Sequence, residues 1–240
     1  MGNELKINLA PTIEDLSVIE KWLKKEDKKY KSGFYCNWNI IEKSFKSNRL
    51  ISLEFNNDVI GFLIYSVGDI YIEIDIMEVS LDYRRNGFGK IFLEKFEDVL
   101  KKQNVLAIKL FCEPRESELF WRKMGFIKFP QRGYSESDLT FYKPIIEVKP
   151  TTENPNNLNK LELWDVEPYQ ATNIGPRWCW DIELENGKLS KPIIQPCNIN
   201  WNLRWTNNGK IVREDKVKYF SNSDNTIEFS PFMYVKQLKE

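Results

Sequence analysis

The chain has 240 residues, of which 35 are Lys or Arg, 35 are Asp or Glu and none is His. At about 150 residues per domain, this length accommodates one large domain or two small ones. The balanced charge argues against a protein whose main partner is nucleic acid, because such binding depends on an excess of basic residues. Without His, imidazole-based triads and His-ligated zinc sites are excluded. Acid–base chemistry must therefore come from Glu, Asp, Tyr, Lys or Cys.

Cysteine spacing and apolar segments give expectations about metals and compartment. No two of the four cysteines form a C-x-x-C pair of the kind found in zinc knuckles and redox motifs. The first eleven residues lack the apolar run of a signal peptide. The longest uncharged apolar stretch, 59–67, is about half the length of a membrane span. We therefore expect a cytoplasmic protein that holds no metal and does not enter a membrane.

Hydrophobic periodicity predicts a strand over Leu5–Leu9, followed by two helices. Thr12 and Asp15 have the spacing of a capping box, so the first helix is expected to begin there and to end in the charged run 24–29. A shorter helix is predicted over 40–45.

Three strands separated by turn residues predict an antiparallel meander. They span Arg49–Phe55, Val59–Val67 and Ile70–Val79. Alternation along the third strand predicts that Ile72, Ile74 and Ile76 share one face, and that Glu73, Asp75 and Met77 share the other. A helix over 87–103, a strand over 107–112, a helix over 116–124 and two further strands then complete a mixed α/β domain.

The composition changes at Lys149, which predicts a second domain. Residues 150–157 contain two prolines and no apolar residue, as is typical of a linker. Beyond it there is no helical period, and the apolar residues of 178–184 and 201–205, several of them Trp, alternate as in strands. Asn186-Gly187 and Asn208-Gly209 predict hairpin turns. We expect a catalytic domain over 1–148 and a small all-β domain over 149–240, with the Trp side chains in its core.

The segment between the third meander strand and the helix at 87–103 predicts an anion-binding site. Its glycines let backbone amides approach a ligand, and the first turn of a helix presents unpaired N–H groups. Arg84, Arg85 and Lys90 add positive charge. The segment completes neither a Walker loop nor a Rossmann turn. It does match the pattern [Q/R]-x-x-G-x-[G/A], as Arg84-Arg85-Asn86-Gly87-Phe88-Gly89.

This motif and the later segment Leu119–Phe126 resemble the GNAT superfamily of N-acetyltransferases over about residues 4–147. The resemblance implies an α/β (α+β) fold with a mixed, mostly antiparallel sheet flanked by helices. It also implies acetyl-CoA as co-substrate, no metal, and direct attack of an amine on the thioester in a ternary complex. The residues implied in coenzyme A binding are Met77, Val79, Arg84, Arg85, Asn86, Gly87, Phe88, Gly89, Lys90 and Trp121.

The resemblance also implies a general base. In many members this is a Glu eleven positions ahead of the motif, which here is Glu73, and Asp75 could replace or assist it. Trp121 stands where the family often has a Tyr that protonates the departing thiolate, and indole has no titratable proton for this work. Tyr134 or Tyr142 could supply a phenol, or the thiolate could leave unassisted.

The leading hypothesis is an N-acyltransferase that uses acetyl-CoA and an amine of a small molecule, peptide or protein. An acidic strand suits a cationic amine but does not identify the acceptor, and the oligomeric state stays open. One alternative is a coenzyme A-binding sensor or assembly module without catalysis. Another is an adaptor in which the first domain is only a scaffold for the all-β domain.

Overall fold

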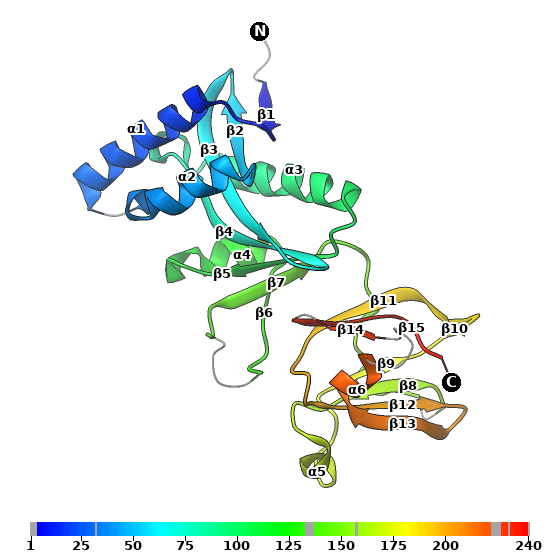
Figure 1. Cartoon of the computed structure of the whole chain (residues 1–240). Coiled ribbons are helices and arrows are strands. Elements are labelled where there is room, and N and C mark those ends of the chain that lie inside the picture. The colour runs from blue at the N-terminus through cyan, green and yellow to red at the C-terminus, as the bar shows by residue number, and fades with distance from the viewer. Residues whose placement is uncertain are drawn as a thin grey trace. The chain divides into compact units, whose positions relative to one another are not determined.

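The computed structural model describes residues 4–31, 33–132, 137–156, 158–221, 227–229 and 231–239. The chain folds into two compact units (Figure 1). The first comprises Met1–Ile127 and Leu139–Ile145, and the second comprises Lys128–Asp138 and Ile146–Glu240. The chain therefore passes between the units three times, and the segment that follows residue 127 belongs to the second unit rather than to the first.

The first unit is built on a seven-stranded sheet with the order β1-β2-β3-β4-β5-β7-β6. Its strands are β1 (Leu5–Asn8), β2 (Leu50–Phe55), β3 (Asp58–Val67), β4 (Tyr71–Val79), β5 (Ala107–Phe111), β6 (Ile127–Lys128) and β7 (Thr140–Pro144). Strands β4 and β5 are parallel, whereas β1 to β4 and the pair β5 and β7 run antiparallel. The mixed, mostly antiparallel sheet and the meander predicted from the sequence are thus confirmed.

Helices cover both faces of this sheet (Figure 1). They are α1 (Ile13–Tyr30), α2 (Trp38–Lys46), α3 (Phe88–Lys102) and α4 (Glu118–Lys123), with short 3₁₀ turns η1 (Phe34–Asn37), η2 (Leu81–Tyr83) and η3 (Arg115–Ser117). Apolar residues of α1 and α2 share one core cluster with β2 and β3. Residues of α3 and α4 belong to a separate cluster that also includes β5 and β7.

The capping box predicted for α1 is present. The Asp15 amide donates to the Thr12 hydroxyl at 3.2 Å, and the Thr12 amide donates to the Asp15 carboxylate at 2.7 Å. The helix does not stop inside the charged run, but continues to Tyr30. Lys28 and Lys29 lie in its last turn, where basic side chains are favourable because of the helix dipole.

The expected face assignment along β4 is wrong, because a bulge interrupts the alternation. Ile76 pairs with Ile64 but Ile74 pairs with Tyr65, so Asp75 is an extra residue opposite the continuous strand β3. Ile72 and Ile74 lie in the core cluster of α3, whereas Ile76 lies in the cluster of α1 and α2. Met77 packs with the α3 cluster. After the bulge, each β4 side chain therefore points to the face opposite to the one expected.

The bulge lies where the pairing between β4 and β5 ends. The parallel register covers only Tyr71 to Ile74 against Ala107 to Leu110, although β4 continues to Val79. Residues 75–79 of β4 therefore have an edge that β5 does not pair. This opening in the sheet determines where the first unit can receive a ligand.

The second unit contains two four-stranded sheets with the orders β10-β11-β15-β14 and β13-β12-β8-β9. Its strands are β8 (Lys160–Leu163), β9 (Trp178–Asp181), β10 (Leu184–Glu185), β11 (Lys188–Pro196), β12 (Asn202–Asn207), β13 (Lys210–Lys216), β14 (Ile227–Phe229) and β15 (Phe232–Gln237). Residues from both sheets share one core, which includes Trp180, Trp201 and Trp205. The prediction that these Trp side chains form core is confirmed.

Two local expectations for the second half of the chain need correction. The alternating run 178–184 is not one strand, because β9 and β10 belong to different sheets. Two short helices, α5 (Pro168–Ala171) and α6 (Val217–Ser221), were not expected, since helices of four and five residues carry too little period to detect. Both hairpin turns are present, with positive φ at Asn186, Gly187, Asn208 and Gly209.

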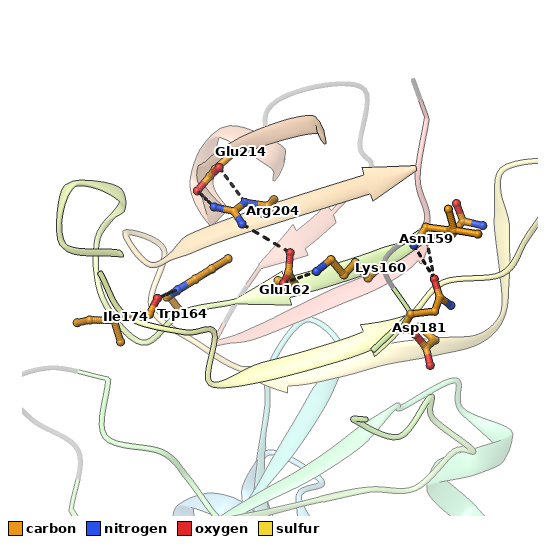
Figure 2. A network of polar contacts seen from close by, with 10 residues as sticks. Asn159, Lys160, Glu162, Trp164, Ile174, Asp181, Arg204 and Glu214 are labelled. Atoms are coloured by element: carbon orange, nitrogen blue, oxygen red, sulfur yellow. Dashed lines mark hydrogen bonds and ion pairs between the residues drawn. The ribbon is translucent and has the colours of Figure 1, made fainter. Parts of the chain in front are cut away.

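A polar network crosses one sheet of the second unit (Figure 2). Arg204 of β12 lies between two carboxylates: its guanidinium donates to Glu214 at 2.8 and 3.0 Å, and one nitrogen is 3.9 Å from Glu162. Lys160 donates to the other oxygen of Glu162 at 2.9 Å. Glu162 is buried, so these partners offset the cost of removing its charge from water.

The segment that follows β6 is anchored within the second unit by one arginine. Arg132 donates to the carbonyl oxygens of Cys197 at 3.1 Å and Pro231 at 2.7 Å, and its own carbonyl accepts from Asn198 at 2.5 Å. The neighbouring Phe129 is buried and meets Phe232 edge to face. Residues 128–132 are therefore an integral part of this unit.

Candidate functional site

The opening between β4 and β5 leads to a cavity of about 660 Å³. Its walls are residues 74–79 of β4, residues 83–85 and 87–90 at the loop and the start of α3, and residues of β5, η3 and α4. The lining includes apolar side chains of β4 and β5, among them Ile74, Met77 and Leu110, and the basic side chains of the loop. All residues implied in coenzyme A binding line this cavity except Asn86.

The loop at one end of the cavity leaves the N-terminus of α3 uncapped. Gly87 is the N-cap residue, has φ +80° and makes no side-chain cap. The first N–H groups of a helix have no partner within it, so they remain available to an anion. A Cβ at Gly87 would meet nothing within 4 Å, and one at Gly89 would lie 3.6 Å from the Phe120 ring.

Asn86 supports the loop from within. Its amide donates to the carbonyl oxygens of Tyr83 and Arg84, each at 3.2 Å. The preceding turn is held by Glu26 of α1, whose carboxylate accepts from the Leu81 amide at 3.0 Å. The loop is therefore fixed by side chains that do not need a ligand.

Arg84 turns back toward β4 instead of reaching away from the loop. Its Nε donates to the carbonyl of Val79 at 2.9 Å, and its Nη2 donates to the carboxylate of Glu78. Glu78 lines the cavity and its side chain is only 13% exposed. Burial raises the pKa of Glu78 to about 7, and Arg84 opposes this rise. Near neutral pH, Glu78 is therefore a carboxyl group that can both accept and return a proton.

The two carboxylates expected to act as bases lie in different surroundings. Asp75 lines the cavity at the bulge and accepts a hydrogen bond from the Ser66 hydroxyl at 2.8 Å. Partial burial raises the pKa of Asp75, and the Ser66 hydrogen bond opposes that effect. Glu73 does not line the cavity and instead accepts two hydrogen bonds from Lys109, at 2.9 and 3.0 Å.

Of the two phenols expected as proton donors, Tyr142 lies in the described part of the chain. Tyr142 is buried, does not line the cavity, and has a pKa raised to about 12 by burial. Tyr134 lies outside the described residues. Trp121 does line the cavity, and its indole Nε1 donates to the hydroxyl of Ser117 at 3.2 Å.

The lining residues that the sequence analysis did not name as site residues include Glu78, Phe34 and Ser117. Glu78 lies on β4 after the bulge, and this irregularity of register leaves no local signal in the sequence. Phe34 belongs to an aromatic loop after α1, and such loops often form binding walls. Ser117 precedes Trp121 by four residues, the spacing of side-chain contacts on one helix face.

An anionic ligand with a long, narrow arm fits these features. The uncapped helix end and the open space at Gly87 accommodate a phosphate group, and Arg85, Lys90 and Lys123 supply charge. The unpaired edge of β4 can hydrogen-bond an extended arm as a missing strand would. Within the described part of the chain, no three Cys, Asp or Glu side chains are placed to hold a metal ion. No helix of that part is long and apolar enough to cross a membrane.

Fold and site together define a mixed sheet that opens at its parallel pair onto a cavity lined in part by basic side chains. Residues 13–126 match the model of the family described as "Acetyltransferase (GNAT) family". This match over residues 13–126 confirms the GNAT resemblance that the sequence motifs predicted. A comparison with curated proteins gave no match.

Solved structures similar to this chain include several acetyltransferases. The PaiA N-acetyltransferase from Thermoplasma acidophilum, in complex with coenzyme A, is 21% identical, with a TM-score of 0.46 over 59% of this chain and 99% of that one. The ribosomal-protein-S18-alanine N-acetyltransferase from Escherichia coli is 21% identical, with a TM-score of 0.45 over 63% and 98%. A GNAT-family acetyltransferase from Bacillus cereus is 19% identical, with a TM-score of 0.46 over 60% and 99%.

Proposed function

We propose that this protein transfers an acetyl group from acetyl-CoA to a primary amine, with both substrates bound together in the first unit. The observation that carries the proposal is the cavity between β4 and β5, which joins an uncapped helix N-terminus to a buried carboxyl group, Glu78. In this proposal the chain is cytoplasmic, the first unit is its catalytic domain and the second, mostly β unit is an accessory domain, so the boundary expected at residue 148 is replaced by the division at residues 127, 138 and 145.

Binding of acetyl-CoA is assigned to the loop and the open edge of β4. The amides at the start of α3, with Arg85 and Lys90, hold the pyrophosphate. The backbone of Met77 to Val79 holds the pantetheine arm as an added strand. Arg84 has a different role from the one first expected, because its guanidinium is engaged by Glu78 and Val79 and so orients the base.

Removal of a proton from the acceptor is assigned to Glu78. A Lys-type amine with pKa about 10.4 is deprotonated only about once in 2,500 molecules at pH 7, which handicaps attack by roughly 4.6 kcal/mol. A general base works best when its pKa lies near the working pH. The pKa of Glu78, at about 7, meets this condition. Asp75 lines the same cavity and is proposed to attract the cationic amine.

The test is calorimetric titration with acetyl-CoA of the wild type, Gly87→Glu and Gly87→Gln. Both substitutions place a side chain of the same size at φ +80°, where nothing lies within 4 Å of the new Cβ, so their backbone strain is equal. Only Glu adds a negative charge beside the pyrophosphate. Two charges about 4 Å apart repel by about 4 kcal/mol at an effective dielectric of 20. We expect Gly87→Glu to bind at least roughly 100-fold more weakly than Gly87→Gln.

Two outcomes would redirect the assignment. If the Glu and Gln variants bind acetyl-CoA with equal affinity, the pyrophosphate does not bind at this loop. Binding without turnover on any primary amine would favour a coenzyme A-dependent sensor or assembly module instead of an enzyme. If binding is confirmed, a screen of peptide and small-molecule amines identifies the acceptor.

A further inference from the structure

Cleavage of a thioester creates a negative charge inside the cavity that the proposed base does not stabilise. When the amine attacks, a C–N bond forms, the C–S bond breaks, and the bonding pair remains on sulfur. The amine proton goes to Glu78, so the sulfur keeps its charge until it leaves. A hydrogen-bond donor aimed at such a developing charge is a large source of catalysis in a water-poor site.

Three side chains that line the cavity carry an uncharged hydrogen-bond donor: Tyr83, Ser117 and Trp121. Tyr83 lies in the loop at the phosphate end, where its ring packs against Phe55 and Phe88. The indole N–H of Trp121 is already given to Ser117. The Ser117 hydroxyl also has an acceptor, the Pro114 carbonyl, but a hydroxyl hydrogen can rotate to another acceptor, whereas an indole N–H is fixed by its ring. Among the described lining residues, Ser117 is thus the uncharged donor outside the phosphate loop whose proton can turn toward a ligand.

Ser117 is anchored at the point where β4 and β5 separate. Its Oγ lies 3.3 Å from the Sγ of Cys112, which follows directly on β5. Pairing of β5 with β4 ends at Leu110, two residues earlier. The hydroxyl is therefore fixed beside the opening into which the thioester arm is proposed to enter.

Trp121 holds this hydroxyl in a defined state. The indole ring is 8% exposed and meets Phe120 and Phe126 edge to face, with centroids 5.0 and 5.2 Å away. Its Nε1 occupies one lone pair of the Ser117 oxygen at 3.2 Å, and the hydroxyl donates to the Pro114 carbonyl at 2.8 Å. The N–H donated by Trp121 polarises the hydroxyl of Ser117, which strengthens the hydrogen bond that this hydroxyl donates.

We propose that Ser117 donates a hydrogen bond to the departing sulfur and that Trp121 is its positioning residue, an inference that rests on the proposed function. A thiolate is a charged acceptor and competes well with the neutral Pro114 carbonyl for the hydroxyl proton. Ser117 keeps its proton throughout, and the thiolate is protonated by solvent after release. Trp121 thus contributes through Ser117 although its own indole cannot act as an acid.

The test measures the pKa of the thiol of bound coenzyme A, which needs no acceptor. Ultraviolet absorbance of the thiolate is followed against pH, and complexes with desulfo-coenzyme A are subtracted to remove the protein's own thiols. Loss of one hydrogen bond to a charged group corresponds to about one pKa unit. We expect Ser117→Ala to raise the thiol pKa by about one unit, Ser117→Thr to retain the wild-type value, and Trp121→Phe to raise it by less.

The outcomes separate this inference from the proposed function. If the wild type binds coenzyme A and Ser117→Ala leaves the thiol pKa unchanged, the role of Ser117 is refuted and the proposed function stands. If the wild type does not bind coenzyme A, both the role of Ser117 and the proposed function are refuted. Melting temperature and coenzyme A affinity show whether each variant is folded. Should Ser117→Ala fail to fold, an unchanged thiol pKa in Trp121→Phe refutes the positioning role, and a raised value supports the relay.

Discussion

Replacing Glu78 by Gln should reduce catalysis and at the same time stabilise the protein at alkaline pH. The pKa of Glu78 is raised by burial from 4.5 to about 7 in the folded state. Between these values the folded protein holds a proton that the unfolded chain releases, so stability falls as the pH rises. Above about pH 7 the full cost is present, and at 1.36 kcal/mol per pKa unit it amounts to about 3 kcal/mol.

Gln retains the shape of Glu and an oxygen that accepts from Arg84, but it carries no charge. We therefore expect Glu78→Gln to be more stable than the wild type by up to about 3 kcal/mol at about pH 8. Near pH 4 the two proteins should be about equally stable, because Glu78 is then mostly protonated in both the folded and the unfolded state. Urea unfolding across this pH range measures the difference. The turnover of Glu78→Gln should fall by roughly 10²- to 10⁴-fold. The wild-type rate should rise with pH through about 7, and the variant should lack this rise.

Glu73→Gln is the matched control on the same strand. Glu73 forms a partly exposed ion pair with Lys109, with side chains 31% and 19% exposed, and such pairs contribute about 1 kcal/mol or less. A pH-independent stability difference for Glu78→Gln would refute the burial argument. A larger loss of turnover in Glu73→Gln than in Glu78→Gln would show that Glu73, not Glu78, is the general base.

Two further predictions concern the second unit. Arg132→Ala removes two hydrogen bonds to carbonyl oxygens of residues 197 and 231, and should lower the free energy of unfolding of this unit by about 2–3 kcal/mol. Urea unfolding measures this loss, with Lys210→Ala as a surface control. Equal free energies of unfolding for the two variants would contradict the prediction. A chain ending at residue 148 leaves Phe129 and Arg132 without their partners, so it should associate in gel filtration. A matched truncation with a short Gly-Ser turn in place of 128–138 should remain monomeric, and identical behaviour of both truncations would disprove the reasoning.

Features that depend on neighbouring residues could be predicted from the sequence. The capping box at Thr12, the hairpins at Asn186-Gly187 and Asn208-Gly209, and the anion loop at Gly87 each result from conformational preferences of a few residues. Nine of the ten residues implied in coenzyme A binding indeed line one cavity. The periodicity of the Trp residues likewise predicted the core of the second unit.

Features that depend on pairing between distant segments could not be predicted. The bulge at Asp75 is an irregularity of register with β3, and Glu78, which follows it, lines the cavity whereas Glu73 does not. The run 178–184 alternates without a break, but its two ends pair with different strands. The place of residues 128–132 depends on carbonyl oxygens 65 and 99 residues later in the chain than Arg132, and backbone carbonyls leave no signal in the sequence.

The three passages of the chain between the units also affect the order in which the protein can fold during synthesis. Arg132 precedes Pro231, whose carbonyl it binds, by 99 residues. At about 5–20 residues per second, a ribosome needs roughly 5–20 s to make that length. The first unit can complete its sheet with β7 in this interval, while Phe129 and Arg132 remain exposed until β15 emerges. The nascent chain therefore carries Phe129 without its partner Phe232, and Arg132 without the Pro231 carbonyl, for seconds.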